Sequence, residues 1–333
     1  MLKSPIRALA LSMLLPLLAF APAAAESIDT TPAKILFGDV KTPIPLEARA
    51  IGSYAKGCLA GAVALPVNGP QWQAMRLSRN RNWGTPELIA FTEKLAADAK
   101  AKDGWPGLLV GDMGQPRGGP ARTGHASHQI GLDVDLWLTP MPNRRLSRDE
   151  RENMSAVSMV NEKARKIDSS VWTMGQHKLI RRAALDPRVA RIFVNPAIKK
   201  ALCDGAGPDR AWLNKVRPWW GHTYHFHVRL DCPPGMASCV PQKATPPGDG
   251  CGEELTAWLQ PPKPTKPTKP TKPTVKPRPM VLADLPPACR QVLIGAPAGI
   301  APEPAPSQAM SYDGALPADI ESPVDQPVTG TLH

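Results

Sequence analysis

The alternation of apolar and polar positions predicts an α+β protein. From position 132 to 138 the residues alternate strictly, so that leucine and valine line one face of a strand while Asp133 and Asp135 lie on the other. Positions 225–230 alternate in the same way and place two histidines on one face. The remaining predicted elements are a helix capped by Thr85, a helix at 175–186, and strands at 108–112 and 189–194. Helices mixed with short, hairpin-like strands favour a small antiparallel sheet flanked by helices and loops.

The histidines are clustered. Five of the seven lie in two short windows: His125 and His128 in the first, and His222, His225 and His227 in the second. Imidazole and carboxylate are the ligands that zinc accepts when no thiolate is offered, and three protein ligands with one open position mark a catalytic site. We therefore expect the small antiparallel sheet to carry a zinc site assembled from two of its strands.

His128 and Asp135 supply two ligands of the expected site. A turn at Gly131 lies between them, so the loop histidine can fold over the carboxylate. Either His225 or His227 completes the set, and the other then stands beside the metal-bound water, where it can move protons or stabilise charge on a carbonyl oxygen. Zn²⁺ lowers the pKa of bound water to about 7 and polarises a carbonyl, so the site suits amide hydrolysis without a further cofactor.

Four residues outside the expected ligand set are candidates for a role in function or in the core. His177 lies on a predicted helix among basic residues, so we expect it to face solvent. Ser127 lies between two histidines, but the chain has no Gly-x-Ser-x-Gly elbow, which argues against a serine hydrolase. Trp219 and Trp220 either wall a substrate groove or belong to the core.

The N-terminus predicts export. Residues 1–25 combine two basic residues, an apolar run and a small-residue end, which is typical of a secretory signal peptide. No later segment is long and apolar enough to span a bilayer, so we expect no stable membrane insertion. An even number of cysteines fits an oxidising compartment and favours disulfides over a thiolate zinc site, because no two have C-x-x-C spacing. They are Cys58, Cys203, Cys232, Cys239, Cys251 and Cys289.

The chain divides into a large domain and an extended C-terminal part. Residues 26–260 hold nearly all the tryptophans and most of the apolar periodicity, enough for one sizeable core, and form the expected metallopeptidase domain. Residues 261–279 contain four Lys-Pro-Thr triplets, which predict an extended spacer. Residues 280–298 are expected to be tied back through Cys289, and residues 299–333 have the composition of a disordered tail.

The positive charge is concentrated in that spacer. The formal net charge is +11, and six of the basic residues lie between 263 and 278 without aromatic residues or an RNA-binding motif. This argues against a nucleic-acid partner. Attraction to an anionic polymer such as cell wall, or a linker that is merely solvated, fits an exported protein better.

Several stretches resemble the penicillin-insensitive murein endopeptidase family of Gram-negative bacteria. They are Gly124 to Leu136, Arg191 to Lys199, Lys215 to Trp219 with His222 to Leu230, and Gly248 to Gly252. That family belongs with the lysostaphin-type enzymes, the D-alanyl-D-alanine metallopeptidases and the hedgehog signalling domain. The resemblance covers roughly residues 50 to 260 and the neighbourhood of Cys289.

The resemblance implies a role for each clustered histidine. His128, Asp135 and His227 match the three zinc ligands, His225 matches a histidine that assists catalysis, and His222 matches another that lines the site.

Two further residues complete the expected site. His125 has a family counterpart that serves a second, non-catalytic metal or the rim of the site. The acid and histidine that would accompany it fall near Lys163 and Lys166, which argues against a second metal. Asp133 shares a face with Asp135, so we expect it to orient a ligand.

The resemblance also implies disulfides, a reaction and a compartment. The implied pairs are Cys58 with Cys289, Cys203 with Cys251, and Cys232 with Cys239. The family cleaves the D-alanyl to meso-diaminopimelyl cross-link of peptidoglycan in the periplasm, and it is insensitive to β-lactams because it uses no acylated serine. Peptidoglycan is therefore the expected partner, and a homodimer is compatible with the sequence.

Two alternatives share the same ligands. A D-alanyl-D-alanine carboxypeptidase would have a closed pocket for a terminal carboxylate, whereas an endopeptidase needs a groove open at both ends. A non-catalytic peptidoglycan-binding protein would have its fourth metal position filled by His125 or another side chain.

Overall fold

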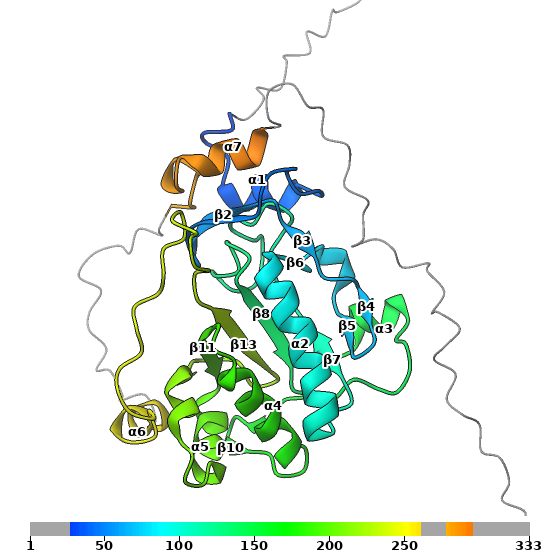
Figure 1. Ribbon diagram of the computed structural model, residues 1–333, viewed down its shortest axis with the longest axis vertical. Coiled ribbons are helices and arrows are strands. Elements are labelled where there is room, and N and C mark those ends of the chain that lie inside the picture. The colour runs from blue at the N-terminus through cyan, green and yellow to red at the C-terminus, as the bar shows by residue number, and fades with distance from the viewer. Residues whose placement is uncertain (1–26, 261–277, 296–333) are drawn as a thin grey trace, which may run out of the picture.

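The computed structural model describes residues 27–260 and 278–295. The predicted signal peptide, the Lys-Pro-Thr triplets and the tail lie outside the described residues. Within these ranges the centre of the fold is a seven-stranded sheet (Figure 1). In spatial order its strands are β12 (Val216–Pro218), β11 (Val189–Val194), β13 (His225–Leu230), β8 (Asp133–Trp137), β7 (Leu108–Val110), β5 (Trp72–Ala74) and β4 (Asn68–Gly69). The predicted α+β class is confirmed.

The strands that carry the histidines are antiparallel, as predicted. β13 pairs with β11 on one side and with β8 on the other, both antiparallel. The sheet extends further through two parallel pairs, β11 with β12 and β5 with β7. Parallel neighbours need a crossover, and helices lie between the paired strands along the chain in both cases. Residue alternation identifies the face of a strand but does not predict such crossovers.

Two helices cover one face of the sheet. α2 (Pro86–Asp103) begins where the Thr85 side chain accepts a hydrogen bond from the Leu88 amide, and it ends at Gly104. α4 (Met174–Leu185) begins with a capping box. Their apolar residues form one cluster with Val134 and Val228 of the central strands, and Figure 1 shows α2 lying across β7 and β8. The polar face of β8 therefore points away from these helices.

The prediction that His177 faces solvent was wrong. Its side chain is only 4% exposed and packs against the ring of Trp212, with 5.7 Å between the ring centroids. His177 lies three positions before Ile180 and seven before Ala184, on the buried stripe of α4. The basic residues that follow it occupy the other side of the helix, so their charge misled the prediction.

A second apolar cluster lies at one end of the molecule. It joins α1 (Ala33–Asp39), β1 (Arg49–Ser53), β2 (Lys56–Ala60) and α7 (Ala288–Ile294), and Figure 1 shows α7 beside α1 and β2. The other elements are β3 (Val63–Ala64), β6 (Trp83–Gly84), α3 (Arg148–Asn153), β9 (Val160–Asn161), β10 (Lys166–Ile167), α5 (Pro196–Gly205) and α6 (Glu253–Leu259). Short 3₁₀ turns occur at Leu77–Arg79, Ala211–Lys215 and Leu282–Asp284.

Three disulfides join distant parts of the described chain. They are Cys58–Cys289, Cys203–Cys251 and Cys232–Cys239, the pairs that the resemblance implies. The first closes a loop of 231 residues and holds α7 against β2. A disulfide over so long a loop stabilises the fold by about 5 kcal/mol in the chain-entropy model. No helix among the described residues has the length and apolar character needed to cross a membrane.

Lys199 of α5 is a fully buried lysine. Its Nζ donates hydrogen bonds to the carbonyl oxygens of Leu213 at 2.9 Å and Asp249 at 2.6 Å. Burial, reinforced by the charge of Arg217, lowers the pKa of Lys199 to about 7. The charged form of this side chain is therefore disfavoured in the folded protein relative to the unfolded chain.

We expect the free energy of unfolding to increase with pH in the native protein, and to increase less in a Lys199→Met variant. Above about pH 7 the unfolded chain binds a proton that the folded protein does not, so the free energy of unfolding increases as pH rises towards 10.5. At about 1.4 kcal/mol per pH unit, the native protein gains about 2 kcal/mol relative to the variant between pH 7 and 9. Urea unfolding at both pH values measures this difference, and equal gains in the two proteins would contradict it.

Candidate metal centre

The pairing of two central strands brings an imidazole and a carboxylate together. In the antiparallel register of β13 and β8, His227 lies opposite Asp135, and Arg229 lies opposite Asp133. Facing residues of neighbouring strands project to the same side of a sheet. The polar faces of the two strands therefore form one surface, opposite the helices.

His128 reaches this surface from the loop before β8. Its backbone is in the left-handed region, with φ at +68°, and Gly131 follows with φ at +70°. This conformation costs a non-glycine residue about 1 kcal/mol. The carboxylate of Asp133 accepts a hydrogen bond of 3.0 Å from the His128 amide and holds the turn in place. Backbone strain of this kind is concentrated at functional sites.

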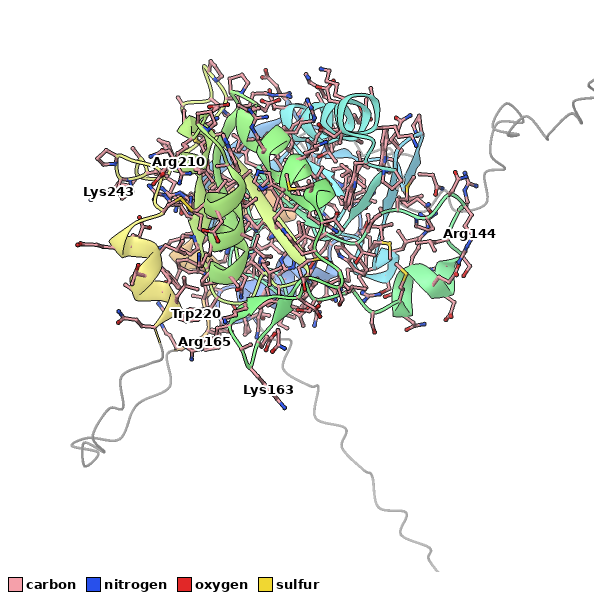
Figure 2. The ribbon with its side chains drawn as sticks, turned by 90° about the horizontal axis from the view of Figure 1, so that it is seen from below. Arg144, Lys163, Arg165, Arg210, Trp220 and Lys243 are labelled. Carbon is pink, nitrogen blue, oxygen red and sulfur yellow. A yellow bond between two sulfur atoms is a disulfide. The ribbon has the colours of Figure 1, made fainter. Side chains whose placement is uncertain are left out.

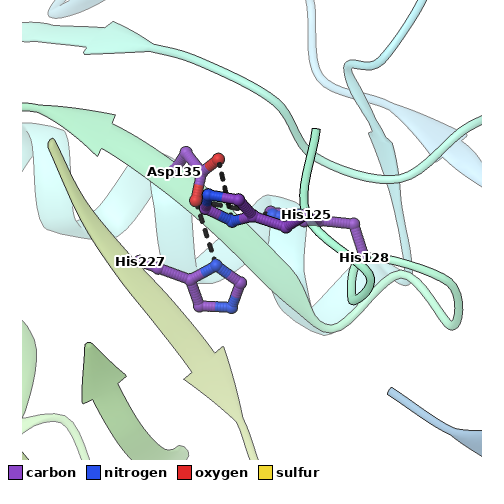
Figure 3. A group of neighbouring side chains, drawn as sticks. All are labelled: His125, His128, Asp135 and His227. Atoms are coloured by element: carbon purple, nitrogen blue, oxygen red, sulfur yellow. Dashed lines mark ion pairs between the residues drawn. The ribbon is translucent and has the colours of Figure 1, made fainter. Parts of the chain in front are cut away.

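The side chains converge on the Asp135 carboxylate, as Figure 3 shows. One oxygen lies 3.0 Å from Nδ1 of His227 and 3.4 Å from Nε2 of His128. The other lies 3.8 Å from Nδ1 of His125. All four side chains offer a ligand atom within 4.8 Å of one another. We call these four residues the metal cluster.

The chemistry of the metal cluster fits a divalent cation. Within the described part of the chain, Nε2 of His128 and Oδ1 of Asp135 are buried without a hydrogen bond. Buried polar atoms without partners are costly, and coordination of a metal would satisfy both. Two imidazole nitrogens and a carboxylate oxygen match zinc, and they also suit other first-row metals.

The charges of the metal cluster are strongly coupled. Burial acts to raise the pKa of Asp135, but the charges of His128 and His225 outweigh it and hold this pKa well below its ordinary value. Burial likewise opposes protonation of His128, yet the negative charge of Asp135 raises the His128 pKa to about 9. A metal ion would take the place of that proton, because a coordinating imidazole must be neutral.

Asp133 contacts His227 on the side of the ring opposite Asp135. It is fully buried, and its carboxylate oxygen lies 2.9 Å from Nε2 of His227, which leaves Nδ1 of that ring directed at Asp135. Arg229 donates a hydrogen bond of 2.7 Å to the same carboxylate, and its guanidinium lies over the ring of Tyr54. A carboxylate behind a ligating histidine fixes the ring orientation and increases its basicity.

Asp133→Asn is expected to weaken metal binding by about 10- to 100-fold, because the amide holds the His227 ring less well. The variant should also lose about 3 kcal/mol of stability, since Arg229 keeps a buried charge without its partner. Competition with a chromophoric chelator measures the first effect. Asp103→Asn, which removes the acid paired with Arg182 on α2 and α4, is the matched control. Equal metal affinity in both variants would show that Asp133 does not position His227.

His222 and His225 lie beside the metal cluster. Both are buried, and their ring centroids are 4.9 Å apart. Nδ1 of His222 donates to the carbonyl oxygen of Trp220, so its Nε2 keeps a free lone pair; neither this nitrogen nor those of His225 make a hydrogen bond among the described residues. Burial lowers the pKa of His222 to about 3 and that of His225 to about 4. Both rings are therefore neutral at physiological pH.

His125 lies on the solvent-exposed side of the other histidine rings. Its side chain is 32% exposed, and it belongs to the metal cluster and also to a second group with His222 and His225 that could hold an ion. Lys163 and Lys166 lie instead on the exposed hairpin of β9 and β10, and Figure 2 shows Lys163 projecting outward. Neither lysine position contributes a ligand to the two groups.

Open cavities flank the metal cluster on both sides. One, of about 450 Å³, is lined by His225 and Asp135. The other, of about 330 Å³, is lined by His222 and His227, and His125 borders both. In the strand order, the first cavity lies on the β7 and β8 side of the cluster and the second on the β11 and β13 side. We call the two cavities together the groove. Such a groove can hold a chain that extends on both sides of a bond.

The groove contains residues that the sequence analysis did not identify. Away from the cluster, the first cavity is lined by Arg76, Arg79 and Tyr224, and the second by Arg191, Phe193 and Arg229. Arg229 continues the alternation that places His225 and His227 on one face, so its position was predictable. Tyr224 lies beside His225 in the second histidine window, whereas Arg76, Arg79, Arg191 and Phe193 come from segments outside both windows. Trp219 and Trp220 are 53% and 58% exposed and line the second cavity, so they belong to the groove rather than the core.

Known proteins resemble this chain over the region that contains the site. A family model described as penicillin-insensitive murein endopeptidase matches residues 50–294. The penicillin-insensitive murein endopeptidase of Haemophilus influenzae is 48% identical over 241 residues, which cover 72% of this chain and 84% of the relative. Proteins of that name from Salmonella heidelberg and Klebsiella pneumoniae are 44% and 43% identical, and the matches cover 75% and 81% of this chain and 88% and 94% of the relatives.

Proposed function

This chain belongs to the family of penicillin-insensitive murein endopeptidases, and we infer from that membership that it is a peptidase acting on peptidoglycan. We propose more specifically that it hydrolyses the D-alanyl to meso-diaminopimelyl cross-link, in the periplasm, with zinc as its metal. The observation that carries the proposal is a cluster of metal-ligating side chains with an open cavity on each side.

His128, Asp135 and His227 are the proposed ligands. Together they would hold a zinc ion, which would supply Lewis acidity towards the scissile carbonyl and would make water nucleophilic near neutral pH. The turn at His128 and the strand pairing of β8 with β13 preorganise the three donor atoms. Asp133, which accepts a hydrogen bond from Arg229, pairs with Nε2 of His227 and fixes the orientation of that ring.

His225 and His222 are the proposed proton-handling and charge-stabilising groups. A neutral imidazole carries one donor and one acceptor, so His225 can take a proton from the attacking water and return it to the leaving amine. Nε2 of His222 can accept a hydrogen bond from water or from the substrate amide, because its Nδ1 donates to Trp220. Burial keeps both rings neutral near pH 7, and only a neutral imidazole has a nitrogen that can accept a proton.

The shape of the groove favours an endopeptidase over a D-alanyl-D-alanine carboxypeptidase. A carboxypeptidase binds a chain end, so one side of its site is closed around the terminal carboxylate. Here the cavities on both sides of the metal cluster have room for further substrate. Their arginines suit the carboxylates of cross-linked stem peptides, because a guanidinium pairs with a carboxylate in a bidentate manner.

One observation favours a non-catalytic peptidoglycan-binding protein. His125 lies close enough to fill the fourth metal position, which would exclude the attacking water. Its Nδ1 is, however, farther from Asp135 than the nearest ring nitrogens of His128 and His227, and its side chain is the most exposed of the three. We therefore assign His125 to the rim of the site, with its role as a further ligand kept as the alternative.

Digestion of purified cross-linked muropeptide dimers tests the proposed function. The mature protein should convert dimers to monomers, as read by mass spectrometry, and a chelator should stop the conversion while penicillin should not. Release of single D-alanine with the cross-links intact would establish the carboxypeptidase instead. A zinc-loaded protein that binds dimers without changing them would establish the binding protein. Light scattering on the same preparation tests the predicted homodimer.

A further inference from the structure

A separate cavity lies next to the groove. It measures about 300 Å³, and its lining includes Trp220, Trp258, Glu162 and Arg165. It is formed where α6 meets the β9–β10 hairpin and the start of α5, and Figure 2 shows Trp220 and Arg165 close together beneath α6. No residue of the metal cluster lines it. It is therefore distinct from the groove, although Trp220 borders both.

Trp220 and Trp258, which line this cavity, form a partly exposed aromatic surface together with Trp219. The Trp258 ring lies 6.0 Å from that of Trp219 and 5.1 Å from that of Trp220, measured between centroids. Trp219 and Trp220 are more than half exposed, and Trp258 is partly exposed. Clustered exposed apolar side chains are typical of a binding site, and tryptophan combines a flat apolar face with a hydrogen-bond donor.

The remaining lining of the cavity is polar. Glu162 offers carboxylate oxygens, and Arg165 keeps further guanidinium donors besides the one that bonds to the carbonyl of Gln260. Asn195 bonds to the Gly221 carbonyl and the Ala197 amide, which fixes the floor of the cavity. Flat aromatic faces edged by donors and acceptors suit a ligand with an apolar ring face and a polar rim, which describes a pyranose sugar.

We propose that this cavity binds the N-acetylated amino-sugar backbone of peptidoglycan while the groove holds a stem peptide. The proposal rests on the proposed function, because a murein endopeptidase meets its peptides only as attachments to a glycan. It adds a second binding site that selects the polymer rather than the scissile bond.

The distance between the two sites matches such a substrate. Ring centroids step from His227 to Phe193 by 5.4 Å and from Phe193 to Trp219 by 5.8 Å. The last step, from Trp219 to Trp258, is 6.0 Å. An extended peptide of about four residues spans about 14 Å. Because the steps follow a bent path of rings, their total is an upper limit on the separation of the two sites, and this limit is only slightly longer than such a peptide. A stem peptide cleaved at the metal cluster therefore ends close to the cavity.

The test compares two substrates that contain the same cross-linked peptide. One is a muropeptide dimer with its sugars, and the other is the dimer after an amidase has removed them. In Trp258→Ala, kcat/KM for the sugar-bearing dimer should fall about tenfold through KM, while cleavage of the sugar-free dimer stays within twofold. Trp258→Phe, which keeps an aromatic face, should recover most of the loss. Leu185→Ala, which truncates an exposed residue on α4, is the matched control.

Binding of peptide-free glycan strands provides a readout that does not depend on cleavage. The strands should quench tryptophan fluorescence of the wild-type protein, and the quenching should weaken about tenfold in Trp258→Ala. If wild type cleaves neither dimer, the proposed function fails, yet this titration still decides the glycan site. No quenching in wild type, or an equal loss on both dimers in Trp258→Ala and Trp258→Phe, would overturn the proposal.

Discussion

Replacing His128 with asparagine should remove the bound metal and lower cross-link cleavage by about ten-thousandfold or more. His128 supplies one of three close ligand atoms, and its Nε2 makes no hydrogen bond within the described chain, so its loss leaves only two donors near the open position. Asparagine tolerates the left-handed backbone of this position better than alanine. The change therefore tests ligation with little effect on the turn. Metal content per chain and the rate of dimer cleavage are the two measurements.

The matched control is His177→Gln, since His177 is the one histidine of the described residues outside the site. This control should keep one metal per chain and most of the activity. His125→Ala belongs in the same series, because His125 is the fourth member of the metal cluster. We expect that variant to retain its metal. A His128→Asn protein that still holds metal and cleaves dimers would show that His128 is not a ligand.

Replacing His225 with glutamine should lower kcat by about a thousandfold while leaving the bound metal in place. Both ring nitrogens of His225 are buried without a hydrogen bond among the described residues, and the ring lies 3.7 Å from the Asp135 carboxylate. Glutamine fills a similar volume but cannot accept and release a proton near neutral pH. The loss should therefore appear in kcat, with little change in KM.

Measuring the metal content of His225→Gln distinguishes a loss of proton transfer from the loss of a metal ligand. If His225→Gln lost its metal, His225 would be a ligand, and the second candidate group with His125 and His222 would become the better assignment. If kcat were unchanged, the proton would move through another group, and His222→Gln would be the next variant to measure. A fall in kcat at full metal occupancy supports proton transfer by His225.

The sequence predicted the two strands of the site because alternation with a period of two assigns each residue to a face. The pattern placed Asp135 on the polar face of one strand and both His225 and His227 on the polar face of the other, and the family resemblance selected His227 as the ligand. The register between the strands did not follow from the pattern, since the period is the same for every even shift, and only packing against α2 and α4 selects the pairing that opposes His227 to Asp135. The contact between His227 and Asp135 therefore depends on tertiary packing and could not be predicted from the local sequence.

Other parts of the site depend on long-range packing and were not predictable. Arg76 and Arg79 reach the groove from the segment that follows β5, and Phe193 reaches it from β11. No local pattern links these positions to the histidine windows. The error at His177 has a similar origin, because the charge of its neighbours was a weaker guide than its place on the buried stripe of the helix.

Reconstitution of the metal-free protein tests directly whether cleavage of the cross-link depends on bound zinc. The protein is stripped of metal, and zinc is then added in increments while the conversion of cross-linked dimers to monomers is measured. We expect no cleavage without metal, and a rise in activity that ends at one zinc ion per chain. Undiminished cleavage by the stripped protein, or intact dimers after full reloading of a folded protein, would contradict it.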